Sequence, residues 1–229
     1  MRKHIGIIVC SLLMSTYAYA AKEPTVKTVI RSWQLPLPTQ LADTVGIDTS
    51  MVNLPMRNPL DDYSISNVFN ANFISPAQSR IYFDRKEQIE DIFGRQYEPY
   101  LKTGHNVQFY NTTVPYSKIA YKRGFTTYHE ENEINFLFTG NLTKDLNLGT
   151  EINYLSGAGH YQDQQGKLFN GSAWTSYHGN HYGLEATVTW NSLKNFENGG
   201  IRDTADINSS LRPEDIPTRM HGMSGYKYT

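Results

Sequence analysis

The sequence NHYGLEATVTWN, residues Asn180–Asn191, alternates apolar and polar side chains with a period of two. A β-strand points successive side chains to opposite faces, so this stretch predicts a strand with one apolar and one polar face. Its length is close to the roughly 9–11 residues that a tilted strand needs to cross a bilayer. Tyr182 and Trp190 lie near the two ends of the apolar face, where a membrane barrel carries its aromatic girdles. A half-buried strand of a soluble protein also alternates in this way. The pattern in the rest of the chain is therefore needed to distinguish a membrane-barrel strand from a strand of a soluble protein.

The preceding stretch, Phe169–His178, has the same alternation and is joined to the first by Gly179-Asn180. A two-residue Gly-x link is typical of a tight β-hairpin. We therefore predict that His178 pairs with His181, which sets Tyr177 opposite Tyr182 and Phe169 opposite Trp190. Aromatic side chains would then meet at both ends of the hairpin.

A second hairpin is predicted from Glu131–Thr143 and Asn147–Ser156, joined by residues 144–146. Pairing Thr143 with Asn147 sets apolar side chains opposite apolar ones along both strands. A shift of one residue would place each apolar face against a polar one, so the pattern specifies which faces match.

Further elements are weaker. We predict strands at Ser79–Asp84, His105–Asn111 and Tyr116–Arg123, one or two helical turns within Arg85–Leu101, and the start of another strand at Tyr226–Thr229.

The predicted connections alternate in length along the chain. Turns at 112–115, 144–146 and 179–180 are short, whereas the loops at 124–130, 157–168 and 192–225 are longer. Short turns at one end and long loops at the other are typical of an outer-membrane barrel. The predicted fold is thus all-β, an antiparallel up-and-down transmembrane β-barrel.

The barrel would be incomplete in this chain, because we find about six to seven strands and the smallest closed barrels have about eight. An open sheet edge cannot lie in hydrocarbon. We therefore expect the N-terminal portion of a longer protein, with a barrel that closes as a homo-oligomer as the alternative.

The N-terminus predicts a signal peptide at residues 1–20. Arg2 and Lys3 precede an apolar run at Ile5–Thr16, and Ala18-Tyr19-Ala20 resembles an A-x-A cleavage site. Cys10 is the only cysteine, so the mature chain would have no disulfide or thiolate metal site. Residues 21–78, interrupted by prolines, form an irregular segment that is either a periplasmic leader or a plug, and residues 79–229 form the barrel part.

Composition excludes some classes of protein. The net charge is -1, which argues against a nucleic-acid partner. The mean hydropathy is negative, which argues against a helical membrane protein. Aromatic residues make up 13% of the chain, and 16 are Tyr while 3 are Trp, which is a composition that favours strands.

The strand pattern assigns two sets of side chains. The polar face, predicted to line a channel, carries Asn135, Asn141, Glu151, Asn153, Glu185, Thr187 and Thr189. The apolar face, predicted to contact lipid, carries Ile134, Phe136, Phe138, Leu142, Leu148, Ile152, Tyr154, Phe169, Ala173, Tyr177, Tyr182, Leu184, Ala186, Val188 and Trp190.

Three clusters of polar residues are candidates for binding sites. His178 and His181 flank a turn and could help to bind a metal, but a hydrated turn is the better interpretation. Glu130, Glu131 and Glu133 could hold a divalent cation, although a solvated loop end is favoured. Charges in the long loop would set ion selectivity if the loop entered a lumen, or would be ordinary surface charge outside it: Asp203, Asp206, Glu214, Asp215, Arg202, Arg212 and Arg219.

No G-x-S-x-G, H-E-x-x-H or glycine-rich phosphate loop is present. We therefore expect no enzyme, no cofactor and no metal.

Four separated blocks resemble the β-barrel porin family of the Bacteroidota outer membrane: NPLDDYSISNVFNANFISPAQSRIYFDR (58–85), FYNTTVPYSKIAY (109–121), FNGSAWTSYHG (169–179) and WNSLKNFENGGI (190–201). The resemblance spans the chain from about residue 50 to its end. It implies an outer-membrane location in a Gram-negative bacterium and a barrel longer than this chain.

The resulting hypothesis is a porin, a passive water-filled channel for small hydrophilic solutes, held in outer-membrane lipid. One alternative is a secreted soluble β-sandwich that binds glycans through Tyr and Trp. Another is an outer-membrane barrel that acts as a transporter, lipid enzyme or assembly factor.

Overall fold

A computed structural model describes residues 29–36, 41–47, 60, 63–69, 74–85, 94–124, 130–159, 161–208, 210–220 and 223–228. The predicted signal peptide, parts of the irregular segment 21–78, and residues 86–93 of the stretch Arg85–Leu101 lie outside the described residues. Within that stretch Arg95–Tyr100 forms a 3-10 helix, which agrees with the predicted helical turns.

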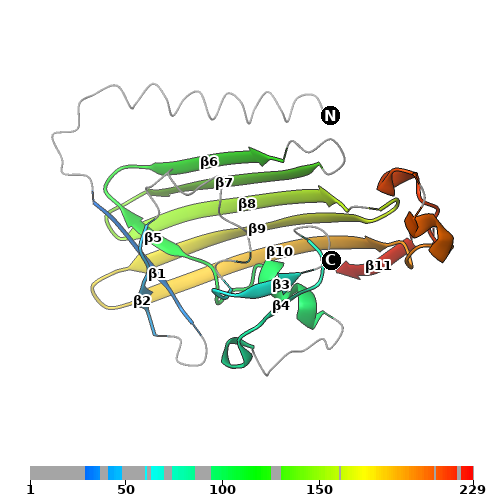
Figure 1. Cartoon of the computed structure of the whole chain (residues 1–229). Coiled ribbons are helices and arrows are strands. Elements are labelled where there is room, and N and C mark those ends of the chain that lie inside the picture. The colour runs from blue at the N-terminus through cyan, green and yellow to red at the C-terminus, as the bar shows by residue number, and fades with distance from the viewer. Residues whose placement is uncertain are drawn as a thin grey trace, which may run out of the picture.

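One antiparallel sheet of six strands dominates the described chain (Figure 1). Each strand pairs with the next along the chain, in the order β6 to β11. The strands are β6 (Tyr116–Arg123), β7 (Glu131–Asn141), β8 (Leu146–Ala158), β9 (Gln165–His178), β10 (Gly183–Glu197) and β11 (Met223–Tyr228). The predicted all-β, antiparallel, up-and-down architecture is confirmed. The described strands form an open sheet with β6 and β11 at its edges, rather than a closed barrel.

The described residues before β6 form two small sheets that are separate from the main sheet. A three-stranded sheet has the order β2 (Asp43–Thr44), β1 (Ile30–Gln34), β5 (Phe109–Thr112), and a small hairpin pairs β3 (Asn67–Phe69) with β4 (Ala77–Ser79). Two 3-10 helices, η1 (Tyr82–Asp84) and η2 (Arg95–Tyr100), accompany them. We call the described residues from 29 to 112 the N-terminal layer.

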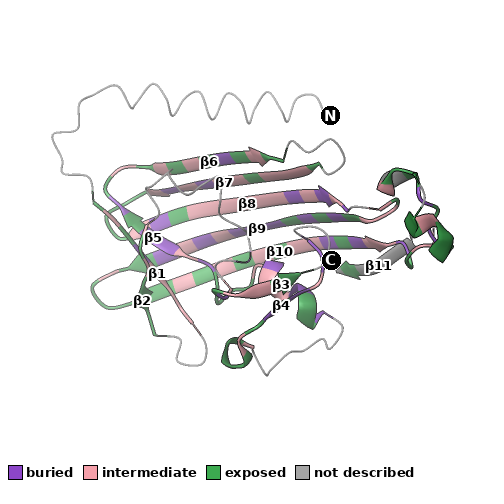
Figure 2. Cartoon of the chain, in the orientation of Figure 1, coloured by how far each residue is buried: buried purple, intermediate pink, exposed green. Residues whose placement is uncertain are grey.

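The N-terminal layer covers one face of the main sheet, which we call the inner face (Figure 1). Two buried clusters join them. Tyr97 and Tyr100 pack with Leu155, Leu168 and Leu193 of the main sheet. In the second cluster, the β5 segment packs on the sheet through Val107, Phe109, Tyr110, Leu137 and Trp174. Because the N-terminal layer covers only the inner face, residues along β9 and β10 alternate between more buried and more exposed positions (Figure 2).

Both predicted hairpins form, but each register differs from the prediction by two residues. Asn141, rather than Thr143, pairs with Asn147. The cause lies in the turn, where the Thr143 hydroxyl accepts a hydrogen bond from the Leu146 amide at 3.1 Å and Leu142 N donates to Leu146 O at 2.9 Å. Thr143 therefore closes the turn instead of extending β7. Because a shift of two preserves the faces of a strand, each side chain keeps its predicted face.

In the second hairpin Gly183, rather than His181, pairs with His178. Gly179 N donates to Tyr182 O at 2.9 Å, so Asn180 and His181 form the centre of the turn. Gly179 is not among the described residues with a positive φ angle. It therefore does not adopt the left-handed conformation that the glycine of a Gly-x turn would adopt. A Cβ at Gly179 would lie 2.6 Å from the Tyr177 hydroxyl oxygen, and this glycine instead makes room for that ring.

Several predicted boundaries were wrong. The predicted loop 157–168 shrinks to 159–164, because Leu155 and Leu168 pair and are buried beneath the N-terminal layer, which extends both strands. The predicted strand Ser79–Asp84 contains the end of β4 and then the 3-10 helix η1. The predicted turn 112–115 joins strands that are not neighbours, because β5 pairs with β1.

The predicted long loop begins later than expected, because β10 continues to Glu197. It contains the 3-10 helices η3 (Thr204–Asn208) and η4 (Pro213–Asp215) and a bridge between Ile201 and Thr218. In Figure 1 these helices lie beyond the end of β10, away from the inner face. The strand predicted from Tyr226 is confirmed and begins at Met223, as β11.

Candidate functional site

The inner face gathers the polar side chains of the main sheet. All seven residues predicted to line a channel occupy positions on this face, because they share the strand parity of the buried inward residues such as Leu137, Leu155 and Leu193. The face is not wholly polar, since those leucines and Trp174 also point inward and pack under the N-terminal layer.

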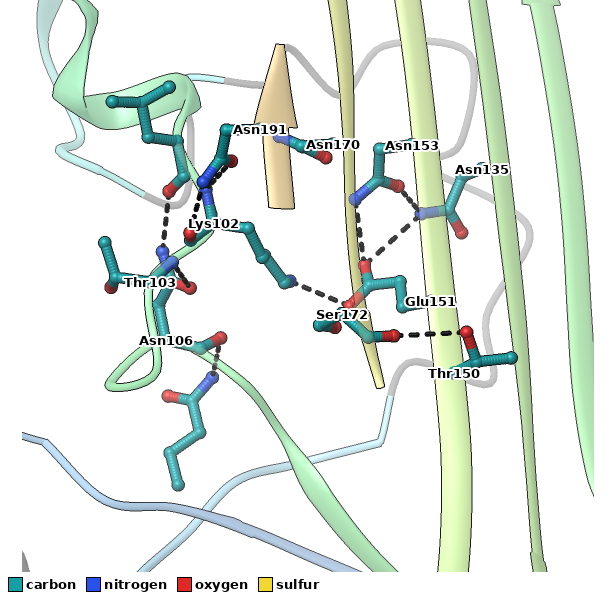
Figure 3. A network of polar contacts seen from close by, with 12 residues as sticks. Lys102, Thr103, Asn106, Asn135, Thr150, Glu151, Asn153, Asn170, Ser172 and Asn191 are labelled. Carbon is teal, nitrogen blue, oxygen red and sulfur yellow. Dashed lines mark hydrogen bonds and ion pairs between the residues drawn. The ribbon is translucent and has the colours of Figure 1, made fainter. Parts of the chain in front are cut away.

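Glu151 lies at the centre of a polar network on the inner face (Figure 3). The Lys102 Nζ is 2.8 Å from one carboxylate oxygen of Glu151, and both side chains are largely buried. The other oxygen accepts hydrogen bonds from Asn153 at 3.2 Å and from Asn135 at 3.5 Å. Asn135 also donates to the side-chain oxygen of Asn153. Three of the predicted polar residues are thus joined around one ion pair.

The asparagines of β9 and β10 hold the N-terminal layer by its backbone and side chains. The Asn191 amide accepts from Lys102 N and donates to Lys102 O, both at 2.8 Å, as a neighbouring strand would (Figure 3). Asn170 donates to Tyr100 O at 2.7 Å, and Asn195 donates to the Tyr97 hydroxyl at 2.9 Å. These contacts fix residues 97–102 along the inner face.

The loop that follows Lys102 has its own cap. Asn106 accepts from Thr103 N at 2.9 Å and donates to Leu101 O at 3.0 Å. The loop lies close to β10, because a Cβ at Gly104 would be 3.3 Å from the Thr187 hydroxyl oxygen.

A second set of contacts lies near the end of the sheet that carries the short turns. The Trp33 indole donates to Glu185 at 2.8 Å, and its ring contacts His178 edge-on at 5.4 Å between centroids. His178 Nε2 is 3.6 Å from the same Glu185 carboxylate. Asn141 accepts a hydrogen bond from the Thr112 amide at 3.1 Å. Glu185 and Asn141 therefore also contact the N-terminal layer.

Buried polar atoms on the inner face of β9 have no protein partner. The Asn170 side-chain oxygen, the Ser172 hydroxyl and the Trp174 indole nitrogen follow one another at every second residue of this strand. Buried polar atoms are normally paired with protein or ordered water. This row is therefore a polar strip between the sheet and the N-terminal layer, and the Trp174 ring at its end also packs in the apolar cluster with Phe109 and Tyr110.

Three tyrosines of the N-terminal layer are held in their neutral form. Burial raises the pKa of Tyr100 and of Tyr110 well above its usual value near 10, and also raises the pKa of Tyr97. The Tyr100 hydroxyl donates to Ser75 O at 3.0 Å. These phenols act as buried anchors of the layer.

Thirteen of the fifteen residues that were predicted to contact lipid lie on the outer face by strand parity, and the other two, Leu142 and Tyr182, lie in the adjoining turns. Many are strongly exposed: Leu184 is 60%, Val188 66% and Tyr182 81% exposed. Trp190 lies over Gly171, where a Cβ would be 2.4 Å from its ring. The predicted Phe169–Trp190 pair is therefore replaced by a glycine–tryptophan pair.

Several described members of the other polar clusters singled out in the sequence take part in ion pairs. The described residues hold no group of three or more metal-ligating side chains. Glu130 pairs with Arg123 at 2.7 Å and Glu133 pairs with Lys122 at 3.0 Å. In the long loop Arg212 pairs with Asp215 at 2.9 Å, and both side chains are exposed. His181 is exposed in its turn.

Sequence reasoning missed the residues that join the two layers, above all Lys102, Trp33, Asn170, Asn191 and Asn195. Asn195 falls within the stretch predicted as a long loop, but the inward parity of Asn170 and Asn191 was readable from the alternation. Their partners were not, because Lys102 and Asn191 are separated by 89 positions and Trp33 and Glu185 by 152.

Among the described residues no helix is both long and apolar enough to cross a membrane. Residues 30–224 match the family described as "Putative porin". No curated protein and no solved structure matches the chain. Because the match covers most of the sequence, the chain belongs to this porin family.

Proposed function

We propose that this member of the porin family forms part of an outer-membrane β-barrel that is a channel for small hydrophilic solutes. Its inner face would border the aqueous lumen and its outer face would contact the hydrocarbon of the lipid. The proposal also places the protein in the outer membrane of a Gram-negative bacterium of the Bacteroidota.

The observation that carries this proposal is the uncovered apolar outer face. Large apolar side chains lie exposed on the outward positions of neighbouring strands, among them Ile119, Ile134, Leu148, Leu184 and Val188. A soluble protein rarely exposes so extended an apolar surface. A lipid-facing barrel surface consists of such residues, with polar residues on the opposite side.

The same observation weighs against a soluble glycan-binding β-sandwich. In a sandwich the apolar faces of two sheets pack on each other. Here the covered inner face holds the ion pair of Lys102 and Glu151 and the asparagine contacts, whereas large side chains of the apolar outer face, such as Leu184 and Val188, are exposed.

Both edge strands of the main sheet, β6 and β11, lack a second neighbour among the described strands. Their backbone groups need partners in hydrocarbon. We propose that further strands of a longer protein complete the barrel, of which this chain is the N-terminal portion, with a second copy of the chain as the alternative source.

The test uses the full-length gene product in its native membrane and after purification. Membrane fractionation should find it in the outer membrane, and reconstitution in a planar bilayer should give ionic current. Recovery as a soluble periplasmic or secreted protein would contradict the proposal. An outer-membrane protein that carries no current under any condition would favour the alternative of an enzyme or assembly factor.

A further inference from the structure

The contacts between the N-terminal layer and the inner face differ from those inside either part. Each sheet forms its own backbone ladders, and among the described residues no strand of the layer pairs with a strand of the main sheet. The polar links are made instead through side chains, such as Asn191 to Lys102 and Trp33 to Glu185. The layer can therefore leave the sheet without breaking a β-ladder.

The centre of this contact is polar and incompletely paired. The ion pair of Lys102 and Glu151 lies beside the buried Ser172, whose hydroxyl has no protein partner. Water that enters on separation would hydrate the carboxylate, the ammonium, Asn170 and Ser172, which lowers the cost of exposing them. The two buried apolar clusters that also join the layer to the sheet gain no such compensation.

The layer also covers the polar residues that would border the lumen. Lys102 reaches Glu151 and, through it, the amides of Asn135 and Asn153. Trp33 covers Glu185, and the loop at Gly104 lies against Thr187. A solute that passes along the inner face therefore has to displace these segments.

We propose that the N-terminal layer is a plug that closes the channel. Two sets of contacts hold it in place: the Lys102–Glu151 ion pair and the two hydrogen bonds between the Asn191 side chain and the Lys102 backbone. We call these contacts together the latch. The channel conducts when the latch opens and the layer moves away from the inner face. This inference rests on the proposed channel function and changes its mechanism from an always open pore to a gated one.

The first test locks the plug to the sheet in the full-length protein. A Cβ at Gly104 would lie 3.3 Å from the Thr187 hydroxyl oxygen, which is near the place that the sulfur of a cysteine at 187 would take. The two positions are therefore close enough for a disulfide to be tested, which requires Cβ atoms about 3.5–4.5 Å apart. The double variant Gly104→Cys with Thr187→Cys should lose its bilayer current under oxidising conditions and regain it with dithiothreitol. The single variant Gly104→Cys controls for the reagents.

Equal current from the oxidised and reduced double variant, with the crosslink verified by mass spectrometry, would overturn the plug and leave the channel standing. No current from either the wild-type protein or a Lys102→Ala variant, in which the latch is broken, would instead contradict the channel function.

The second test follows the release of the plug without any current. Ser172 is 0% exposed beneath the layer, so the thiol introduced by Ser172→Cys should react slowly with a hydrophilic maleimide. Adding Lys102→Ala should speed this reaction by about tenfold or more, because it leaves the Glu151 carboxylate buried and unpaired.

The matched control is Lys122→Ala, which breaks the Lys122–Glu133 pair. That pair is also on the inner face and is similarly buried, but it joins β6 to β7 within the main sheet. It should leave the rate of labelling unchanged. Equal acceleration by both lysine variants, or fast labelling before any change, would overturn the latch.

Discussion

The Lys102 ammonium lies 2.8 Å from the Glu151 carboxylate and connects the N-terminal layer to the middle of the main sheet. Glu151→Gln keeps the shape of the side chain and removes its charge. We expect the free energy of unfolding to fall by about 1.5–3 kcal/mol, which is the range for hydrogen bonds to charged groups. Urea titration of the purified protein in detergent measures it.

The control reverses the pair. Lys102→Glu alone should be more damaging than Glu151→Gln, because it places two carboxylates together, and adding Glu151→Lys should recover most of the loss. Failure of the exchanged pair to recover any stability would show that the ion pair does not hold the layer.

Two glycines of the main sheet lie under tryptophan rings on opposite faces. A Cβ at Gly149 would be 2.2 Å from the Trp174 ring. Gly149→Ala should therefore displace this ring from the core under the layer and destabilise the protein by about 1–3 kcal/mol, as overpacking does. Thermal unfolding followed by tryptophan fluorescence measures both effects.

Gly183→Ala is the matched control, because the nearest atoms to its added Cβ are 3.9 Å away. It should change the melting temperature little. A loss as large as that of Gly149→Ala would contradict the packing explanation.

The outer face is tested by an arginine at Ala186, an exposed position on its apolar surface. A charge near the middle of the bilayer costs about 2–4 kcal/mol, so Ala186→Arg should reduce the amount of protein assembled in outer-membrane fractions. Phe138→Arg on β7 should do the same. The control Ala205→Arg makes the same chemical change in the exposed 3-10 helix η3. Equal assembly of all three variants would refute the lipid contact.

Alkaline pH should weaken the N-terminal layer through Tyr100. An unfolded tyrosine loses its proton near pH 10, but burial raises the pKa of Tyr100 well above this value. Its contribution to stability is thus complete below about pH 10 and is lost as the pH rises above it. Urea midpoints measured from about pH 8 to about pH 11 should fall across this window.

Tyr100→Phe should be less stable at neutral pH, because it loses the hydrogen bond to Ser75 O, and it should show a smaller fall above pH 10. An unchanged pH profile in this variant would assign the alkaline loss to other groups.

The two faces of the main sheet were predictable because they depend only on a local period of two. The shift of both hairpins by two residues leaves this parity intact, so Phe138 and Ala186 keep their outer positions although their partners change. The registers themselves depend on turn contacts such as that of the Thr143 hydroxyl with Leu146 N, which alternation does not encode.

The interface between the N-terminal layer and the main sheet was not predictable. Its contacts join residues that are far apart in the sequence, and none of these residues belongs to a recognisable motif. Asn191 has the same polar character as many loop asparagines, and Lys102 follows a proline-interrupted segment without clear periodicity. The extension of β8 and β9 through Leu155 and Leu168 likewise depends on cover by Tyr97 and Tyr100.

The central claim is that alternate residues of one strand face lipid and the channel side. Spin labels placed singly by cysteine substitution at Leu184, Glu185, Ala186, Thr187 and Val188 of the full-length protein in liposomes test it directly. We expect collision with oxygen, which concentrates in the lipid, to be high at 184, 186 and 188 and low at 185 and 187. Equal oxygen accessibility at all five positions, or strong collision of the even positions with a water-soluble nickel complex, would contradict the account.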